Sequence, residues 1–126
     1  MARVLVIERD REVRGILVSY LKISLEIRRS DIVTAKSHWT AIHVMDENSN
    51  ELKVAIVGKI SEGNALRDEQ NLIYILENHL QNIKTIFCTG HDMVGRGINV
   101  PRPEKESIGQ VIRDMSTVKD ILLEAL

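Results

Sequence analysis

Short apolar runs alternate along the chain with longer stretches in which apolar residues recur at helical spacing. The runs at residues 4–7 and 54–57 are continuously apolar and mostly β-branched, a pattern typical of strands buried on both faces of a sheet. More mixed runs predict three further strands, at residues 31–35, 84–88 and 98–100, the last of which is stopped by Pro101. The pattern therefore predicts five strands.

Helical periodicity follows the runs at residues 4–7 and 31–35. Asp10 offers an N-cap to the first helix, and Ser37 offers one to a second helix that gives way to a polar loop at residues 46–51. The second helix is expected to bury one apolar stripe, either Trp39, Ile42 and Met45 or a neighbouring one.

Two more helical patterns complete the alternation, at residues 66–80 and 107–126. Strands that alternate with helices and are themselves apolar predict a parallel sheet covered by helices on both faces. The 126 residues suffice for one compact domain, and no internal repeat or low-complexity segment suggests a second. We therefore expect a single α/β domain over residues 1–126.

Composition and charge argue against several classes of function. The chain has 17 Lys and Arg against 18 Asp and Glu, so nothing suggests the basic surface that nucleic acid requires. No apolar stretch approaches the ~20 residues of a membrane span, and no signal-peptide pattern opens the chain, which predicts a cytoplasmic protein. Cys88 is the single cysteine and the four His lack ligand spacing, so we expect no disulfide, metal or cofactor.

Parallel strands place the loops that follow them, and any ligand, at the carboxyl edge of the sheet. The candidate site residues are therefore those that follow the predicted strands: Glu8, Arg9, Asp10, Gly58, Lys59, Thr89 and Arg102.

Several of these residues lie in segments that resemble a known family. Residues 3–14 (RVLVIERDREVR) resemble the first strand and helix of response-regulator receiver domains, in which that strand ends in a cluster of acidic residues. Residues 54–58 and 86–90 resemble the third and fourth strands of the family, and residues 101–103 are similar to the Lys-Pro step after its fifth strand. The resemblance implies a flavodoxin-like, doubly wound five-stranded fold and a role in bacterial two-component signalling.

The departures from the receiver pattern concern its chemistry. A receiver needs a carboxylate nucleophile and further carboxylates that hold Mg²⁺, but the acceptor position carries Gly58. Arg9 replaces a usually acidic residue, and its guanidinium would repel the cation and compete for Glu8. Arg102 stands where the family has Lys, and Thr89 matches fully. Phosphorelay through the usual aspartate is therefore excluded.

A second departure is one of length. The stretch between Thr89 and Arg102 must hold a crossover and a strand, whereas a crossover with its helix takes at least ~10–12 residues and a strand ~5–6. We therefore expect the fourth helix to be shortened or missing. In the family this helix contributes to the signalling and dimer surface, so residues 90–97 and the last helix are the candidate partner surface.

The candidate site residues form what we call the vestigial phosphorylation pocket, and several of them have more than one possible role. Gly58 either opens the site to a ligand or is merely tolerated in a tight turn. Lys59 either pairs with Glu8 in place of a cation or is a solvated lysine. Glu8 could also form a salt bridge with Arg9 or Arg102 that holds the pocket in one state.

The preferred hypothesis is a pseudo-receiver that has no enzymatic activity. It would act by phosphorylation-independent contact with a signalling protein or sensor kinase, and homodimer formation is left open. One alternative is a domain that binds a small molecule in the crevice near Gly58. The other is a phosphoryl-accepting regulator with an atypical acceptor such as Asp10.

Overall fold

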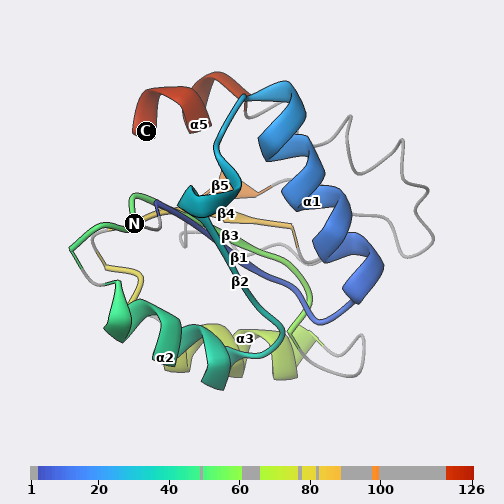
Figure 1. The fold of residues 1–126 in the computed structure, drawn as a ribbon. Helices are drawn as coiled ribbons and strands as arrows, with labels where there is room; N and C mark the ends of the chain where they lie inside the picture. The colour runs from blue at the N-terminus through green and yellow to red at the C-terminus, as the bar shows by residue number, and fades with distance from the viewer. Residues whose placement is uncertain are drawn as a thin grey trace.

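Within the described residues, five parallel strands form one sheet in the order β2-β1-β3-β4-β5 (Figure 1). The computed structural model describes residues 3–48, 50–60, 66–76, 78–81, 83–88, 98–99 and 119–126, with the backbone alone for residues 66–70 and 98–99. The strands are β1 (Val4–Ile7), β2 (Ile32–Ala35), β3 (Val54–Val57), β4 (Lys84–Phe87) and β5 (Ile98–Asn99). This order confirms the predicted doubly wound, flavodoxin-like sheet.

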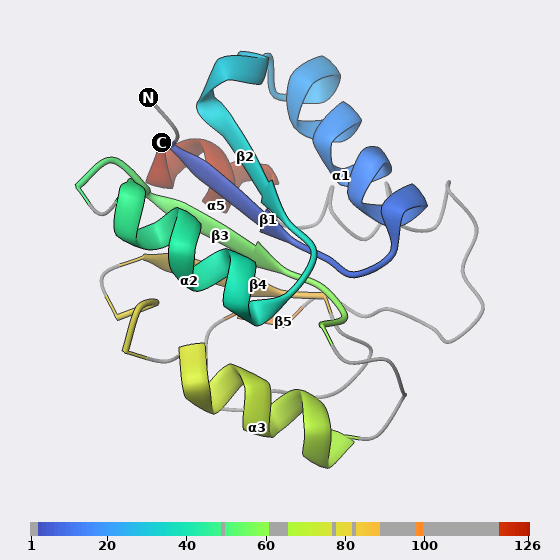
Figure 2. The ribbon, with the colours of Figure 1, turned by 60° about the horizontal axis from the view of Figure 1, so that its bottom comes forward.

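Helices cover both faces of this sheet. They are α1 (Arg11–Ser24), α2 (His38–Glu47), α3 (Leu66–Leu76) and α5 (Lys119–Ala125), with a 3₁₀ turn, η1 (Arg29–Asp31), before β2. Figures 1 and 2 show α1 and α5 on one face and α2 and α3 on the other. The strand-to-strand crossovers thus pass over opposite sides of the sheet, as the alternation of patterns predicts.

Strand β1 supplies the two halves of the core in alternation. Val4 and Val6 pack with residues of α1 and α5, whereas Leu5 and Ile7 pack with residues of α2 and α3. All four side chains have no exposed surface. Successive side chains of a strand point to opposite faces, so a strand covered on both sides must be apolar throughout.

Both predicted N-caps are confirmed. The Oδ1 atom of Asp10 accepts hydrogen bonds from the main-chain N–H groups of Glu12 at 2.8 Å and Val13 at 3.1 Å. The Oγ atom of Ser37 accepts from the N–H of Thr40 at 3.2 Å. Each side chain thereby satisfies main-chain donors that have no partner inside the helix.

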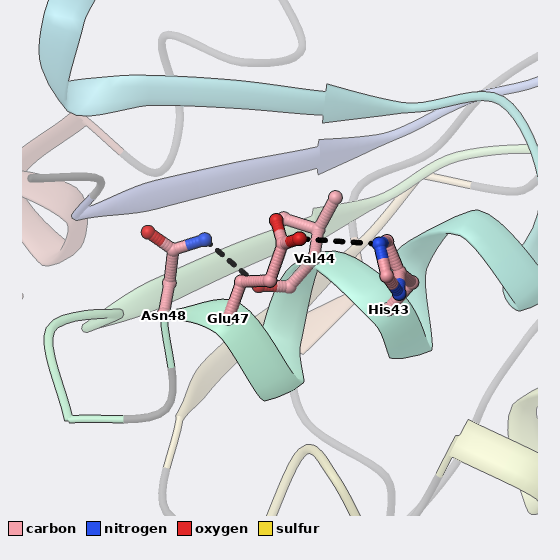
Figure 3. A network of polar contacts seen from close by, with 4 residues as sticks. All are labelled: His43, Val44, Glu47 and Asn48. Atoms are coloured by element: carbon pink, nitrogen blue, oxygen red, sulfur yellow. Dashed lines mark hydrogen bonds and ion pairs between the residues drawn. The ribbon is translucent and has the colours of Figure 1, made fainter.

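The end of α2 lies later in the chain than the sequence pattern predicts. Figure 3 shows its last turn, where the side-chain amide of Asn48 donates to the Val44 carbonyl at 2.8 Å. His43 Nε2 also lies 3.1 Å from Glu47 Oε1. The helix therefore includes the first two residues of the predicted loop at 46–51.

The predicted stripe of Trp39, Ile42 and Met45 is buried only in part, because Trp39 is not part of the core. Its side chain is 67% exposed, while Ala41 and Met45 are buried against the sheet. Helix α3 ends at Leu76 rather than Leu80, and the N–H groups of His79 and Leu80 in the following turn both donate to the Leu76 carbonyl.

Several expectations fall on parts of the chain that are not described. Residues 91–97, where the fourth helix is expected to be short or missing, lie outside the described residues, as does the predicted helix before Lys119. Of the helices that the structure describes, none combines the length and apolarity needed to cross a membrane.

Candidate functional site

Glu8 is a charged residue buried without exposed surface at the carboxyl end of β1. Its Oε2 atom accepts a hydrogen bond from the main-chain N–H of Asp10 at 2.8 Å, and its Oε1 atom accepts one from the N–H of Lys59 at 3.1 Å. A buried carboxylate requires such donors, because loss of hydration is costly unless hydrogen bonds replace it. The Glu8 side chain therefore joins the loop after β1 to the residue after Gly58.

Main-chain pairing continues past the strand ends around Glu8. The N–H of Gly58 donates to the Ile7 carbonyl at 2.6 Å, and the N–H of Arg9 donates to the Lys59 carbonyl at 2.7 Å. On the other side, the N–H of Glu8 donates to the Ala35 carbonyl at 2.9 Å. The ends of β2, β1 and β3 are therefore fixed relative to one another by the backbone.

Arg14 also reaches this edge, although sequence reasoning did not single it out. From the first turns of α1 its Nη1 atom donates to the Glu8 carbonyl at 2.9 Å and lies 3.4 Å from the Arg9 carbonyl oxygen. The signal that could have indicated it is a basic residue one turn into the helix that follows a strand. Its long side chain can reach back over the strand end.

The described part of this edge does not fit a magnesium site. Mg²⁺ is usually held by one or two carboxylates that keep it close to solvent. Glu8 is buried against two main-chain amides, Asp10 Oδ1 caps α1, and Gly58 has no side chain. No three His, Cys, Asp or Glu side chains among the described residues are grouped so as to hold a metal ion.

The structure places five of the seven predicted site residues at one edge: Glu8, Arg9, Asp10, Gly58 and Lys59. Lys59 does contact Glu8, and the contact that the structure describes uses its main-chain N–H. The Arg9 side chain is exposed and Gly58 is buried. Thr89 and Arg102 lie outside the described residues, so their place in the site stays a prediction.

A second surface feature lies along α1. An open groove of about 450 Å³ runs along the helix past Gly15, Ile16, Ser19 and Ile23. A side chain at Gly15 would meet nothing within 4 Å, and Ile23 is 78% exposed. Sequence reasoning missed this groove because its apolar residues fit the periodicity of a buried helix face.

No family profile and no curated protein sequence matches the chain. Among solved structures, the chain is similar to the receiver domain of the hybrid histidine kinase CckA, with a TM-score of 0.64 and 17% identity over 97% of this chain and 99% of that domain. It is also similar to a response regulator receiver domain protein from Clostridium thermocellum, with a TM-score of 0.57 and 17% identity over 100% of both chains.

A designed protein limits what these likenesses mean. A de novo designed Rossmann 2x3 protein aligns with a TM-score of 0.62 and 11% identity, over 96% of this chain and 91% of that protein. A sequence designed de novo thus has nearly the same structural similarity to this chain as the natural receivers. The comparisons therefore establish a receiver-like fold, and function has to be argued from the site.

Proposed function

We propose that the chain is a pseudo-receiver, a two-component-type signalling module that acts through protein–protein contact without aspartyl phosphate. The observation that carries this proposal is the presence of Gly58 at the end of β3 beside a buried Glu8 carboxylate that accepts from the main-chain N–H of Lys59. The end of β3 offers no nucleophile, and the nearest carboxylate already binds two main-chain amides. A phosphoryl group would therefore find no aspartate carboxylate at the end of β3 to which it could be transferred.

Asp10 is a poor candidate for an alternative phosphoryl acceptor. Its Oδ1 atom caps α1 through the amides of Glu12 and Val13, and phosphorylation of the carboxylate would disturb that cap. The capping role explains why an aspartate stands at this position without any phosphoryl chemistry.

A fixed carboxyl edge supports a module whose partner surface is constant. The link between Glu8 and Lys59 and the pairing of Arg9 with the Lys59 carbonyl hold two loops in one arrangement. The expected partner is a cytoplasmic signalling protein or sensor kinase, and the domain itself is expected to lack enzymatic activity. The groove past Gly15 and Ile23 supports contact with a protein, because exposed apolar surface often marks such sites.

Phosphorylation with a small-molecule donor tests this proposal. The protein is incubated with acetyl phosphate and Mg²⁺ and its intact mass is measured, with an active receiver domain treated in parallel as the positive control. The proposal predicts no added phosphoryl group under conditions that label the control. A stoichiometric adduct that maps to one carboxylate, at Asp10 or elsewhere, would overturn it.

A further inference from the structure

Strand β2 is the outermost strand at one end of the described sheet, with β1 as its neighbour (Figure 2). The main-chain N–H and C=O groups on the outer side of such a strand can pair with a strand of another molecule, and proteins generally protect them. The way in which the β2 edge is protected therefore decides whether two copies of the chain can associate through it.

Hydrogen bonds to β1 show which residues of β2 face the outer side. The Asp31 carbonyl accepts from the N–H of Arg3 at 2.8 Å, and the Ala35 carbonyl accepts from the N–H of Glu8 at 2.9 Å. Successive residues of a strand direct their main-chain groups to opposite sides, so the residues next to Asp31 and Ala35 face away from β1. Within β2, Ile32 and Thr34 therefore direct their N–H and C=O groups outward.

Both outward groups of Ile32 are bonded to one residue, Arg29. The Nη1 atom of Arg29 donates to the Ile32 carbonyl at 2.6 Å, and the N–H of Ile32 donates to the Arg29 carbonyl. A guanidinium is a charged donor, so its hydrogen bond is stronger than one between neutral groups. Arg29 thereby satisfies one of the two outward residues of this four-residue strand.

Pairing between the β2 strands of two copies would need these same groups. In a two-fold, antiparallel pair centred on Thr34, Ile32 of one copy lies opposite Lys36 of the second copy. Opposite residues at such a position exchange both N–H···O bonds, but both groups of Ile32 already bind Arg29. Because it binds an outward carbonyl, the Arg29 side chain also lies on the side from which the second strand would approach.

We propose that the Arg29 side chain is an autoinhibitory contact that closes the outer edge of β2 to β2 of a second copy. Loss of this contact exposes the Ile32 carbonyl, and two copies then associate through antiparallel β2 strands. The inference is independent of the proposed pseudo-receiver function, because the contact includes no residue of the vestigial phosphorylation pocket.

A charge-matched pair of variants tests the role of Arg29. Arg29→Ala removes the donor to Ile32, whereas Arg28→Ala removes an adjacent exposed cation whose side chain makes no capping hydrogen bond to η1. Self-association is measured by sedimentation velocity over a range of protein concentrations. Each dimer opens two equivalent edges, so we expect Arg29→Ala to associate at least about tenfold more tightly than wild type, and Arg28→Ala to differ from wild type by less than about twofold.

A second substitution locates the added contact. Thr34→Pro removes an N–H that faces outward rather than toward β1, a change that an edge strand tolerates. In the Arg29→Ala background it should return self-association to the wild-type level, whereas Thr34→Val, which keeps the N–H, should not. Far-UV circular dichroism checks that each variant keeps its fold. Hydrogen exchange of the Thr34 amide gives a second measurement without a proline, and in Arg29→Ala it should slow as the protein concentration rises.

Three results would overturn the proposed contact. The first is equal self-association of Arg29→Ala and Arg28→Ala. The second is added association in Arg29→Ala that leaves Thr34 amide exchange unchanged, because the copies would then meet elsewhere. The third is wild-type protein whose Thr34 amide is already protected in a concentration-dependent way, since the edge would then be open. None of these results bears on the pseudo-receiver proposal, which is tested by covalent phosphorylation and intact mass.

Discussion

Glu8 and Lys59 follow two adjacent strands, and the buried side chain of Glu8 accepts a hydrogen bond from the main-chain N–H of Lys59 at 3.1 Å. The same carboxylate accepts from the N–H of Asp10 at 2.8 Å. A carboxyl group contributed by β1 thus lies beside the position where the receiver pattern implies one at the end of β3. Where the receiver pattern implies a phosphate-accepting carboxylate, this edge therefore has a hydrogen-bonded link between the loops after β1 and β3.

Removal of the Glu8 carboxylate should destabilise the fold. Glu8→Ala leaves two part-buried main-chain donors without their acceptor, and each unsatisfied donor costs ~1–3 kcal/mol. We therefore expect a loss of about 2–4 kcal/mol in the free energy of unfolding, measured by urea denaturation. Glu12→Gln, which changes an exposed acid of α1, should stay within about 0.5 kcal/mol. Equal stability of the two variants would contradict the role given to Glu8.

The cap at Asp10 predicts a smaller and more local effect. Asp10→Ala removes the acceptor of the Glu12 and Val13 amides and should cost about 1 kcal/mol. Asp10→Asn keeps an acceptor oxygen and should retain most of the stability. The measurement is thermal unfolding followed by far-UV circular dichroism, and a larger loss for Asn than for Ala would count against the cap.

The last helix offers two adjacent leucines in different environments. Leu122 has no exposed surface and packs in the core with residues of α1 and β1, whereas Leu123 is 46% exposed. Leu122→Ala should therefore cost about 2–4 kcal/mol of unfolding free energy, because it leaves a cavity. Leu123→Ala should cost less than about 1 kcal/mol. Reversal of this order in urea denaturation would show that α5 packs by another face.

His38 gives the protein a weak dependence of stability on pH. Burial lowers the pKa of His38 below its ordinary value of 6.5 in the folded state. The unfolded state then takes up a proton more readily, so the contribution of His38 is fully present above pH 6.5 and is lost as the pH falls through and below that value.

The difference in slope between wild type and His38→Gln isolates this contribution. Unfolding free energies measured from pH 7.5 down to 5.5 should fall more steeply for wild type than for the variant. A direct titration of the His38 ring by NMR should give a pKa below 6.5. A ring pKa above that value, or a steeper slope in the variant, would contradict the effect of burial.

The sheet and its covering helices were predictable because their signals are local. Continuous apolar runs at residues 4–7 and 54–57 mark strands that are covered on both sides, and Asp10 and Ser37 mark helix starts by their short acceptor side chains. These features depend on the chemistry of a few neighbouring residues. No long-range information is needed to recognise them.

The errors arose where the neighbours of a residue in space decide its environment. Trp39 and Met45 belong to one predicted stripe, and only the position of the sheet shows that Met45 is buried while Trp39 is exposed. The helical pattern to Leu80 is real in that Leu80 is buried, but the residue lies in a turn after α3.

The position of the described candidate residues at one edge of the sheet was predictable, whereas their contacts were not. Strand ends bring Glu8, Gly58 and Lys59 together, as topology requires. That Glu8 binds main-chain amides, and that Arg14 reaches back to the Glu8 carbonyl, depends on loop geometry that the sequence does not encode locally. Thr89 and Arg102 remain predictions.

The central claim is that the carboxyl edge does not respond to phosphoryl chemistry. Its most direct test is the amide NMR spectrum of the protein with beryllofluoride, recorded with and without Mg²⁺, because this reagent mimics an aspartyl phosphate in the presence of the metal. The account predicts no Mg²⁺-dependent shift at Asp10 or Lys59, whose amides stay bonded to Glu8. A saturable shift of these two signals that requires Mg²⁺ would contradict it.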